Sequence, residues 1–411
     1  MKTLSILYYD SMVMANNVVA VVTSRSQYAR VKTALQALND DERIDFDLIV
    51  SGGALVHRFG DISDIMEDAG LEIDKKIHTL LEAGEPVAQA KTTGIGLVEY
   101  ATAFEEFDPD VVLTSGDRHE TMASTLAASY LNIPVVHLEG GEITGSIDDK
   151  VRHATTKMAD YHLVSTDRSK KIVRQLGEPA NRIYRTGCPS IELAEQIIQE
   201  GRDNYDPQTE YGGVGEAVDV SQDYIVVQYH PLPTEYESNY DKTQELIKAY
   251  ELLDVQAFWF WPNMDAGTDQ VSKAIRKYRE QQDPDGVRFF ISLDPHDYLT
   301  MVKNATCMVG NSSVGIRECS YFGVPTVNIG ERQQSRERGP NVLDVACDAD
   351  EIAAGIETQL QQGLYPQSTI YGNGNAARKI TDTIAELNPE LKPPMTPELL
   401  GYHESDTNDR I

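Results

Sequence analysis

Acidic side chains follow two consecutive predicted strands in the stretch 110–149. Asp117 comes shortly after the apolar run DVVLT, and Glu139 comes directly after the apolar run Ile133–Leu138. Asp148 stands where a further helix is expected to begin. Because the carboxyl ends of parallel strands meet at one edge of a sheet, these three carboxylates could converge on one site. Carboxylates brought together raise one another's pKa and thereby supply a general base, so the stretch predicts proton-transfer chemistry.

Ordinary structural roles compete with this interpretation. An aspartate after a strand commonly caps a turn. Acids such as Asp148 and Asp149 in a first helical turn also complement the helix dipole. Spacing alone leaves both interpretations of the acids open.

Alternating strand and helix patterns predict a doubly wound α/β architecture in both halves of the chain. The first half opens with a buried strand from Asn17 and a helix whose apolar residues recur at helical spacing. A long helix is expected over 85–107. The segment 201–222 is rich in Gly, Asp and Gln without periodicity, which is typical of a domain boundary. Five further strands are expected after it, near 224–228, 257–261, 288–292, 306–309 and 324–329.

Polar residues also follow the strands of the second half. His230 comes after the strand at 224–228. Gly310, Ser312 and Ser313 precede a helix expected to run through Phe322, and a helix amino terminus with hydroxyl donors suits a pyrophosphate. A plain serine cap is the alternative. The loop 330–341 carries three arginines, whose forked guanidinium groups suit phosphate oxygens.

Taken together, several motifs resemble a known family over most of residues 18–378. They are GDR followed by an acid two residues on, IPVVHLEGGEITGSIDDKVRHATTKMADYH, QYHP at 228–231, GNSSVGIREC at 310–319 and NIGERQQSRERGPNV at 328–342. The chain is similar to the hydrolysing UDP-N-acetylglucosamine 2-epimerases of sialic-acid and related nonulosonic-acid pathways. Such an enzyme converts UDP-N-acetylglucosamine and water into N-acetylmannosamine and UDP.

The resemblance implies an α/β fold of the GT-B type, in which two Rossmann-like doubly wound parallel-sheet domains face a central cleft. The expected parts are an extension (1–16), a sugar-side domain (17–200), a linker (201–222), a UDP-binding domain (223–370), a helix crossing back to the first domain (371–387) and a disordered tail (388–411). A homodimer or homotetramer that needs no cofactor is expected.

The resemblance also implies roles for individual residues. Proton transfer is assigned to Asp117, Glu139 and Asp148, and His230 is expected to stabilise the departing phosphate by a positive charge or a donated hydrogen bond. The implied substrate-binding residues are Arg25, Arg118, Asn263, Asp265, Ser312, Ser313, Glu318 and Arg332.

One position departs from the family pattern. Related enzymes commonly carry a histidine directly before the leucine of the segment after the second strand, whereas Ala54 stands there in this chain and the nearest histidine is His57. Either His57 reaches the site, or one polar contact to the sugar is absent. The second case suits UDP-2,4-diacetamido-2,4,6-trideoxyglucose, which has a methyl group in place of a hydroxymethyl group. A non-hydrolysing 2-epimerase, a GT-B glycosyltransferase and a non-catalytic UDP-sugar sensor are less favoured alternatives.

Composition excludes other classes of function. The chain has 411 residues, of which 41% are hydrophobic, so it can bury the cores of two domains. A formal net charge of −29 argues against general nucleic-acid binding. The four cysteines and nine histidines show no metal-ligand spacing, so we expect no metal in the chemistry. No apolar run has the length of a membrane span and no secretory leader is recognisable, so we expect a cytoplasmic protein without a membrane partner.

Overall fold

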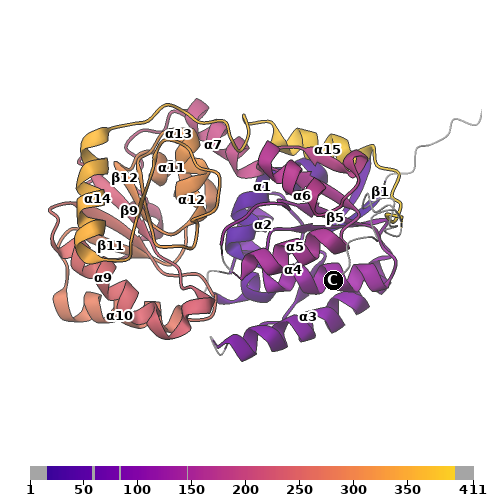
Figure 1. Cartoon of the computed structure of the whole chain (residues 1–411), viewed down its shortest axis with the longest axis horizontal. Helices are drawn as coiled ribbons and strands as arrows, with labels where there is room; N and C mark the ends of the chain where they lie inside the picture. The colour runs from indigo at the N-terminus through magenta and orange to yellow at the C-terminus, as the bar shows by residue number, and fades with distance from the viewer. Residues whose placement is uncertain (1–15, 58–60, 83–84, 146, 394–411) are drawn as a thin grey trace, which may run out of the picture.

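Two α/β units built on separate sheets make up the protein (Figure 1). The computed structural model describes residues 16–57, 61–82, 85–145 and 147–393. The first sheet orders its strands β3-β2-β1-β4-β5-β6-β7, and all of its pairs are parallel. Its strands are β1 (Asn16–Val22), β2 (Ile44–Ser51), β3 (Lys75–Ile77), β4 (Val111–Ser115), β5 (Val135–Leu138), β6 (Tyr161–Val164) and β7 (Ile183–Arg185). The order reverses between β1 and β4, which is where a doubly wound sheet opens a crevice for a ligand.

The second sheet repeats this winding with one added edge strand. Its order is β14-β13-β12-β9-β10-β11-β8, and only the pair β11–β8 is antiparallel within the described residues. The strands are β8 (Val214–Gly215), β9 (Tyr224–Gln228), β10 (Gln256–Phe260), β11 (Val287–Phe290), β12 (Cys307–Gly310), β13 (Thr326–Ile329) and β14 (Val342–Val345). The segment 201–222, expected to be a linker, contains a short helix at Gln208–Tyr211 and the strand β8, which pairs with the outer edge of β11. The domain boundary itself stays a prediction.

Helices cover the faces of both sheets. In the first half they are α1 (Arg25–Asn39), α2 (Ser63–Asp68), α3 (Pro86–Phe107), α4 (His119–Tyr130), α5 (Asp148–Met158), α6 (Asp167–Gln175) and α7 (Pro189–Glu200). In the second half they are α8 (Gln208–Tyr211), α9 (Asn239–Glu251), α10 (Thr268–Gln282), α11 (Pro295–Lys303), α12 (Ser313–Ile316), α13 (Glu318–Phe322), α14 (Ala349–Gln362) and α15 (Ala376–Ala385). The long helix α3 confirms the one expected over 85–107. Among these described helices, none combines the length and apolar character that a membrane crossing requires.

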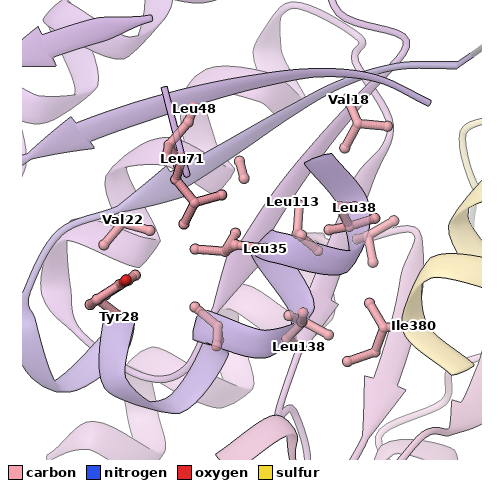
Figure 2. Close-up of a cluster of buried hydrophobic side chains, with 14 of the residues drawn as sticks. Val18, Val22, Tyr28, Leu35, Leu38, Leu48, Leu71, Leu113, Leu138 and Ile380 are labelled. Atoms are coloured by element: carbon pink, nitrogen blue, oxygen red, sulfur yellow. The ribbon is translucent and has the colours of Figure 1, made fainter. Parts of the chain in front are cut away.

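Parallel strands buried on both faces explain why the sequence shows apolar runs and not alternation. Figure 2 shows one face of the first sheet, where Leu35 of α1 packs among residues such as Val18 and Leu113 from the strands. Ile380 of α15 joins the same cluster and is fully buried. Each large aliphatic side chain buried in this way contributes about 1.5–3 kcal/mol. The last helix, α15, is therefore part of the first domain's core.

The segment after α15 is also attached to the first domain. The Tyr161 hydroxyl donates to the Asn388 carbonyl at 3.0 Å, and the Lys392 ammonium lies 3.1 Å from the Glu178 carboxylate. Residues 388–393, which were predicted to be disordered, are thus ordered because they supply partners for buried polar groups. The rest of the predicted tail, 394–411, and residues 1–15 of the predicted extension lie outside the described residues; residue 16 already belongs to β1.

The helix expected from Ser313 through Phe322 is broken in the middle. Its two parts, α12 and α13, are separated by Arg317, whose backbone angles are φ −98° and ψ −73°. The break matters because the Arg317 side chain leaves the helix for acids of the first domain, whereas Glu318 stays on the cavity wall.

Candidate active site

A cavity of about 240 Å³ lies between the carboxyl ends of the two sheets. Residues that follow β1, β2, β4 and β5 form most of its first-domain wall, and residues that follow β9, β10, β11, β12 and β13 form most of its second-domain wall. All of the predicted site residues except one line it: Arg25, Asp117, Arg118, Asp148, His230, Asn263, Asp265, Ser312, Ser313, Glu318 and Arg332. The tertiary structure thus gathers residues as distant in the sequence as Arg25 and Arg332, as the topological switch points predict.

Glu139 is the predicted residue that does not line the cavity. It is 2% exposed and lies behind the wall, where one carboxylate oxygen is 3.1 Å from Arg30 and the other is 2.8 Å from Arg317. Its backbone is left-handed, with φ 64°, a conformation that is uncommon for residues other than glycine. Burial alone would raise the pKa of Glu139, but the two guanidinium charges outweigh burial and lower it. Glu139 therefore does not line the cavity, and its role in proton transfer stays a prediction.

Asp117 faces the cavity as an ionised carboxylate. It follows β4 and Gly116, and its carboxylate accepts a hydrogen bond from Arg152, with Arg336 3.9 Å away. Burial alone would raise the pKa of Asp117, but Arg152 and two further arginines hold it well below the usual range of a carboxyl group. An acid in this setting is a weak base until its arginine partners are drawn elsewhere.

The neighbouring acids Asp148 and Asp149 have different positions. Asp149 accepts the backbone N–H groups of Thr144 and Gly145 at 2.8 Å each and pairs with Arg152 at 2.6 Å, so it holds the loop before α5. Asp148, at the start of the same helix, lines the cavity. The sequence left open whether these acids stabilise the start of the helix or face the cavity. In the structure, Asp149 holds the loop before the helix and Asp148 lines the cavity.

His230 is held as a neutral imidazole at the end of β9. Its Nδ1 accepts the backbone N–H of Asn263 at 3.1 Å, so the ring hydrogen is on Nε2. Burial, assisted by the charge of Arg332, lowers the pKa of His230 to about 3. Of the two modes expected for this residue, burial disfavours a positive charge and favours hydrogen-bond donation.

The second-domain wall contains a set of donors at the turn after β12. The Ser312 side chain caps α12 by accepting the N–H of Val314, and Arg332 donates to the Asn311 carbonyl at 3.2 Å. Because α12 has only four residues, its aligned peptide dipoles are few, and the expected dipole contribution to phosphate binding is small. Glu318 is 3% exposed, and burial raises its pKa.

First-domain arginines reach across the cavity to the second domain. Arg118 lies 2.8 Å from Asp265, and Arg25 donates to the Ile291 carbonyl. Burial lowers the pKa of Arg25 to about 10, which still leaves it charged at neutral pH. Asp265 also accepts from Asn263 at 2.6 Å, so its carboxylate organises neighbouring side chains. These contacts hold the two walls of the cavity together.

Several charged residues of this region were missed from the sequence or given no role. Arg30, Arg152 and Arg317 each contact a predicted acid or its neighbour, and Glu142 binds both Arg317 and Arg336. The available signals were the i, i+3 spacing of Asp149 and Arg152 and the position of Arg317 directly before Glu318. His119, at the first position of α4, lines the cavity and lies 3.2 Å from Glu120.

The segment after β2 reaches the cavity at Gly53, where Met264 of the second domain packs against it. His57 is exposed and does not line the cavity, whereas Gly53 does. A Cβ placed on Gly53 would lie 1.8 Å from the Met264 sulfur, so the cavity residue Met264 packs directly on this backbone. Ala54 is fully buried. Of the two possibilities raised by the sequence, the absence of a histidine contact fits this geometry.

The described part of the chain contains no group of three or more histidine, cysteine or acidic side chains placed to hold a metal ion. Its four cysteines are free thiols. The proposal that the chemistry needs no metal stays a prediction.

Fold and site together define a GT-B protein, with two Rossmann-like domains and a cavity between them. The structure of UDP-N-acetylglucosamine 2-epimerase from Neisseria meningitidis, bound to UDP-N-acetylglucosamine, superposes with a TM-score of 0.74 at 16% identity and covers 90% of this chain and 100% of that chain. This similarity confirms the predicted fold class.

The particular family follows from sequence comparison. The family described as UDP-N-acetylglucosamine 2-epimerase matches residues 36–385, and the chain belongs to it. It is 32% identical over 366 residues to the UDP-N,N'-diacetylbacillosamine 2-epimerase (hydrolyzing) of Legionella pneumophila, covering 89% of this chain and 94% of the relative. It is 30% identical over 383 residues to a polysialic acid biosynthesis protein of Escherichia coli, covering 90% and 95%. The family resemblance of the motifs is thereby confirmed.

Proposed function

We propose that the protein is a hydrolysing 2-epimerase that converts UDP-N-acetylglucosamine and water into N-acetylmannosamine and UDP. The observation that carries the proposal is the pairing of two walls across one cavity. Asp117 and Asp148 face it from the first domain, and the neutral donor His230 faces it with Ser312 from the second. The Legionella relative, whose name includes the hydrolytic reaction, supports the hydrolysing branch.

The proposed reaction begins with an elimination. A carboxylate removes the proton from C2 while the bond between C1 and the phosphate oxygen breaks, so that a C1–C2 double bond forms and UDP leaves with the bonding electrons. The departing phosphate oxygen accepts hydrogen bonds from the His230 Nε2–H and from the Ser312 and Ser313 hydroxyls. The product of this half is 2-acetamidoglucal.

Hydration of the glucal completes the reaction. A carboxylate takes a proton from water, the hydroxide adds at C1, and a carboxylic acid returns a proton to C2 from the opposite face. Two acids on different sides of the sugar are therefore required. We assign this work to Asp117 and Asp148, with Glu139 as a third acid that needs a rearrangement of its arginine partners to enter the cavity.

A second substrate is favoured by the wall formed by Gly53 and Met264. UDP-N,N'-diacetylbacillosamine is UDP-2,4-diacetamido-2,4,6-trideoxyglucose, whose C6 methyl group suits an apolar surface better than a hydroxymethyl group does. The Legionella relative is named for this sugar. With either sugar, we propose that the product feeds the synthesis of a sialic or related nonulosonic acid.

Proton NMR in D2O, with each UDP-sugar in a separate sample, tests both substrates. We expect a free 2-epimerised sugar that carries deuterium at C2, together with UDP. Turnover of the diacetamido sugar alone would replace the first substrate by the second. A UDP-sugar epimer without free sugar would instead indicate the non-hydrolysing reaction, and absence of turnover with both would contradict the proposed function.

A further inference from the structure

Arg317 joins the two domains through acids that lie behind the cavity wall. It is 1% exposed, and its guanidinium lies 2.8 Å from Glu139 and 2.7 Å from Glu142, both of the first domain. The same group lies 5.6 Å from the ring centroid of Tyr371. Arg317 does not line the cavity, so any effect it has on the reaction passes through the residues it holds.

The position of Arg317 in the chain links it to the second-domain wall. It ends α12, which begins at Ser313, and it directly precedes Glu318; both of these neighbours line the cavity. A displacement of this turn by a ligand therefore also displaces the guanidinium. Because a packed interior transmits such shifts, Glu139 and Glu142 have to follow or lose their partner.

Glu139 forms ion pairs with two arginines. Arg30 of α1 binds one carboxylate oxygen at 3.1 Å and Arg317 binds the other, while the backbone of Glu139 stays left-handed at φ 64°. Such a conformation is unfavourable for a residue with a side chain. The contact with Arg317 comes from the other domain, so it exists only while the two domains are together.

We propose that Arg317 is a positioning residue that couples occupancy of the second-domain wall to the placement of Glu139 and Glu142 in the first domain. The kinetic part of this inference rests on the proposed function. The structural part does not, because it requires only that UDP bind to the second-domain wall.

The test compares Arg317→Met, which removes the guanidinium group but keeps an unbranched side chain, with Arg317→Lys and with wild type. Arg168→Met is the matched control, because Arg168 also crosses between the domains, to the Ser335 carbonyl at 3.0 Å, without touching an acid. We expect Arg317→Met to lower kcat by about 100-fold, since small misplacements of reacting groups have effects of that size. The Kd for UDP, from calorimetry, should stay within about threefold of wild type because no group on the cavity wall changes.

Two further readouts separate positioning from a merely structural role. The guanidinium lowers the pKa of Glu139, so Arg317→Met should move the acidic limb of the kcat/KM profile to higher pH, and Arg317→Lys should restore it in part. In hydrogen-exchange mass spectrometry, UDP should slow exchange of the peptide 135–143 in wild type and Arg168→Met but not in Arg317→Met.

Slowing of exchange by UDP in Arg317→Met as in wild type would overturn the inference, as would a loss of UDP affinity in proportion to kcat. If Arg317→Met does not fold, Arg317→Lys takes its place. UDP should then slow the exchange of peptide 135–143 less in Arg317→Lys than in wild type, and equal slowing would overturn the inference. If wild type turned over neither sugar but still showed slowing that depends on Arg317, the proposed function would fail and the coupling would stand.

Discussion

The arginine-held acids on the first-domain side of the cavity and the hydrogen-bond donors on its second-domain side handle charge in opposite ways. On the first-domain side, Asp117, Glu139 and Glu142 are each close to two arginines. On the second-domain side, His230 is neutral and the serines after β12 offer hydroxyl groups. A buried carboxylate needs opposite charge to offset its desolvation, whereas donors that receive an anion work best when no internal anion occupies them.

This difference shows what has to happen before the acids can act as bases. As long as the arginines are paired with them, the pKa values of Asp117 and Glu139 stay low. A bound UDP group brings phosphate charges that compete for Arg336, which lines the cavity and lies 3.9 Å from Asp117. We therefore expect substrate binding to redistribute the arginines and thereby to raise the basicity of the acids.

The largest effect is expected when the first-domain wall loses Asp117, one of its cavity-facing carboxylates. Asp117→Asn keeps the shape but removes the base, so kcat should fall by about 1,000-fold, within the range of a lost general base. Turnover is measured by release of UDP. Asp110→Asn is a suitable control, because Asp110 lies just before β4, at its opposite end, and accepts the Asn17 N–H at 2.9 Å. A kcat for Asp117→Asn within threefold of wild type would remove Asp117 from the chemistry.

On the second-domain wall, His230→Ala should lower kcat by about 100-fold through the loss of one donor to the leaving oxygen. His230→Gln, which restores an N–H donor, should recover part of the activity. Because the pKa of His230 is about 3, its contribution should not change between pH 6 and 8. If kcat of wild type fell as pH rose through 6–7 and kcat of His230→Ala did not, a charged imidazole would act here.

A smaller effect is expected on the pH dependence of stability, where a buried neutral histidine and an acid held by arginines should lose their contributions at different pH. Burial lowers the pKa of His137 to about 4, so the unfolded chain binds a proton more readily and stability decreases as pH falls from 6.5 towards 4. At pH 5 this histidine alone should cost about 2 kcal/mol of unfolding free energy. Burial would raise the pKa of Glu142, but its arginines lower it to about 2, so its contribution is lost at lower pH, between 4.5 and 2.

Thermal unfolding midpoints between pH 3 and 8 measure both losses of stability, an upper stage caused by His137 and a lower stage caused by Glu142. His137→Gln should remove much of the upper stage and leave the lower one, while the exposed His57→Gln should change neither. An upper stage that persists unchanged in His137→Gln would show that other groups cause it.

Local patterns carried much of the fold and of the site. Apolar runs located the central strands, and the polar residues after them, from Arg25 to Arg332, indicated the cavity wall because parallel sheets bring carboxyl strand ends together. Periodicity did not detect β8 or the break at Arg317, because a two-residue edge strand and a one-residue break have no repeating pattern. The attachment of residues 388–393 to the first domain was missed because their partners, such as Tyr161 and Glu178, are distant in the sequence.

The sequence by itself determined which residue types stand at the strand ends and thus the class of chemistry that the cavity can perform. Only the tertiary structure decided their states. It turned Glu139 away from the cavity, neutralised His230 by burial, and assigned Asp149 to the loop and Asp148 to the wall. The physical reason is that protonation and orientation depend on desolvation and on charges from distant segments, such as Arg317 beside Glu139, and neither is encoded in local spacing.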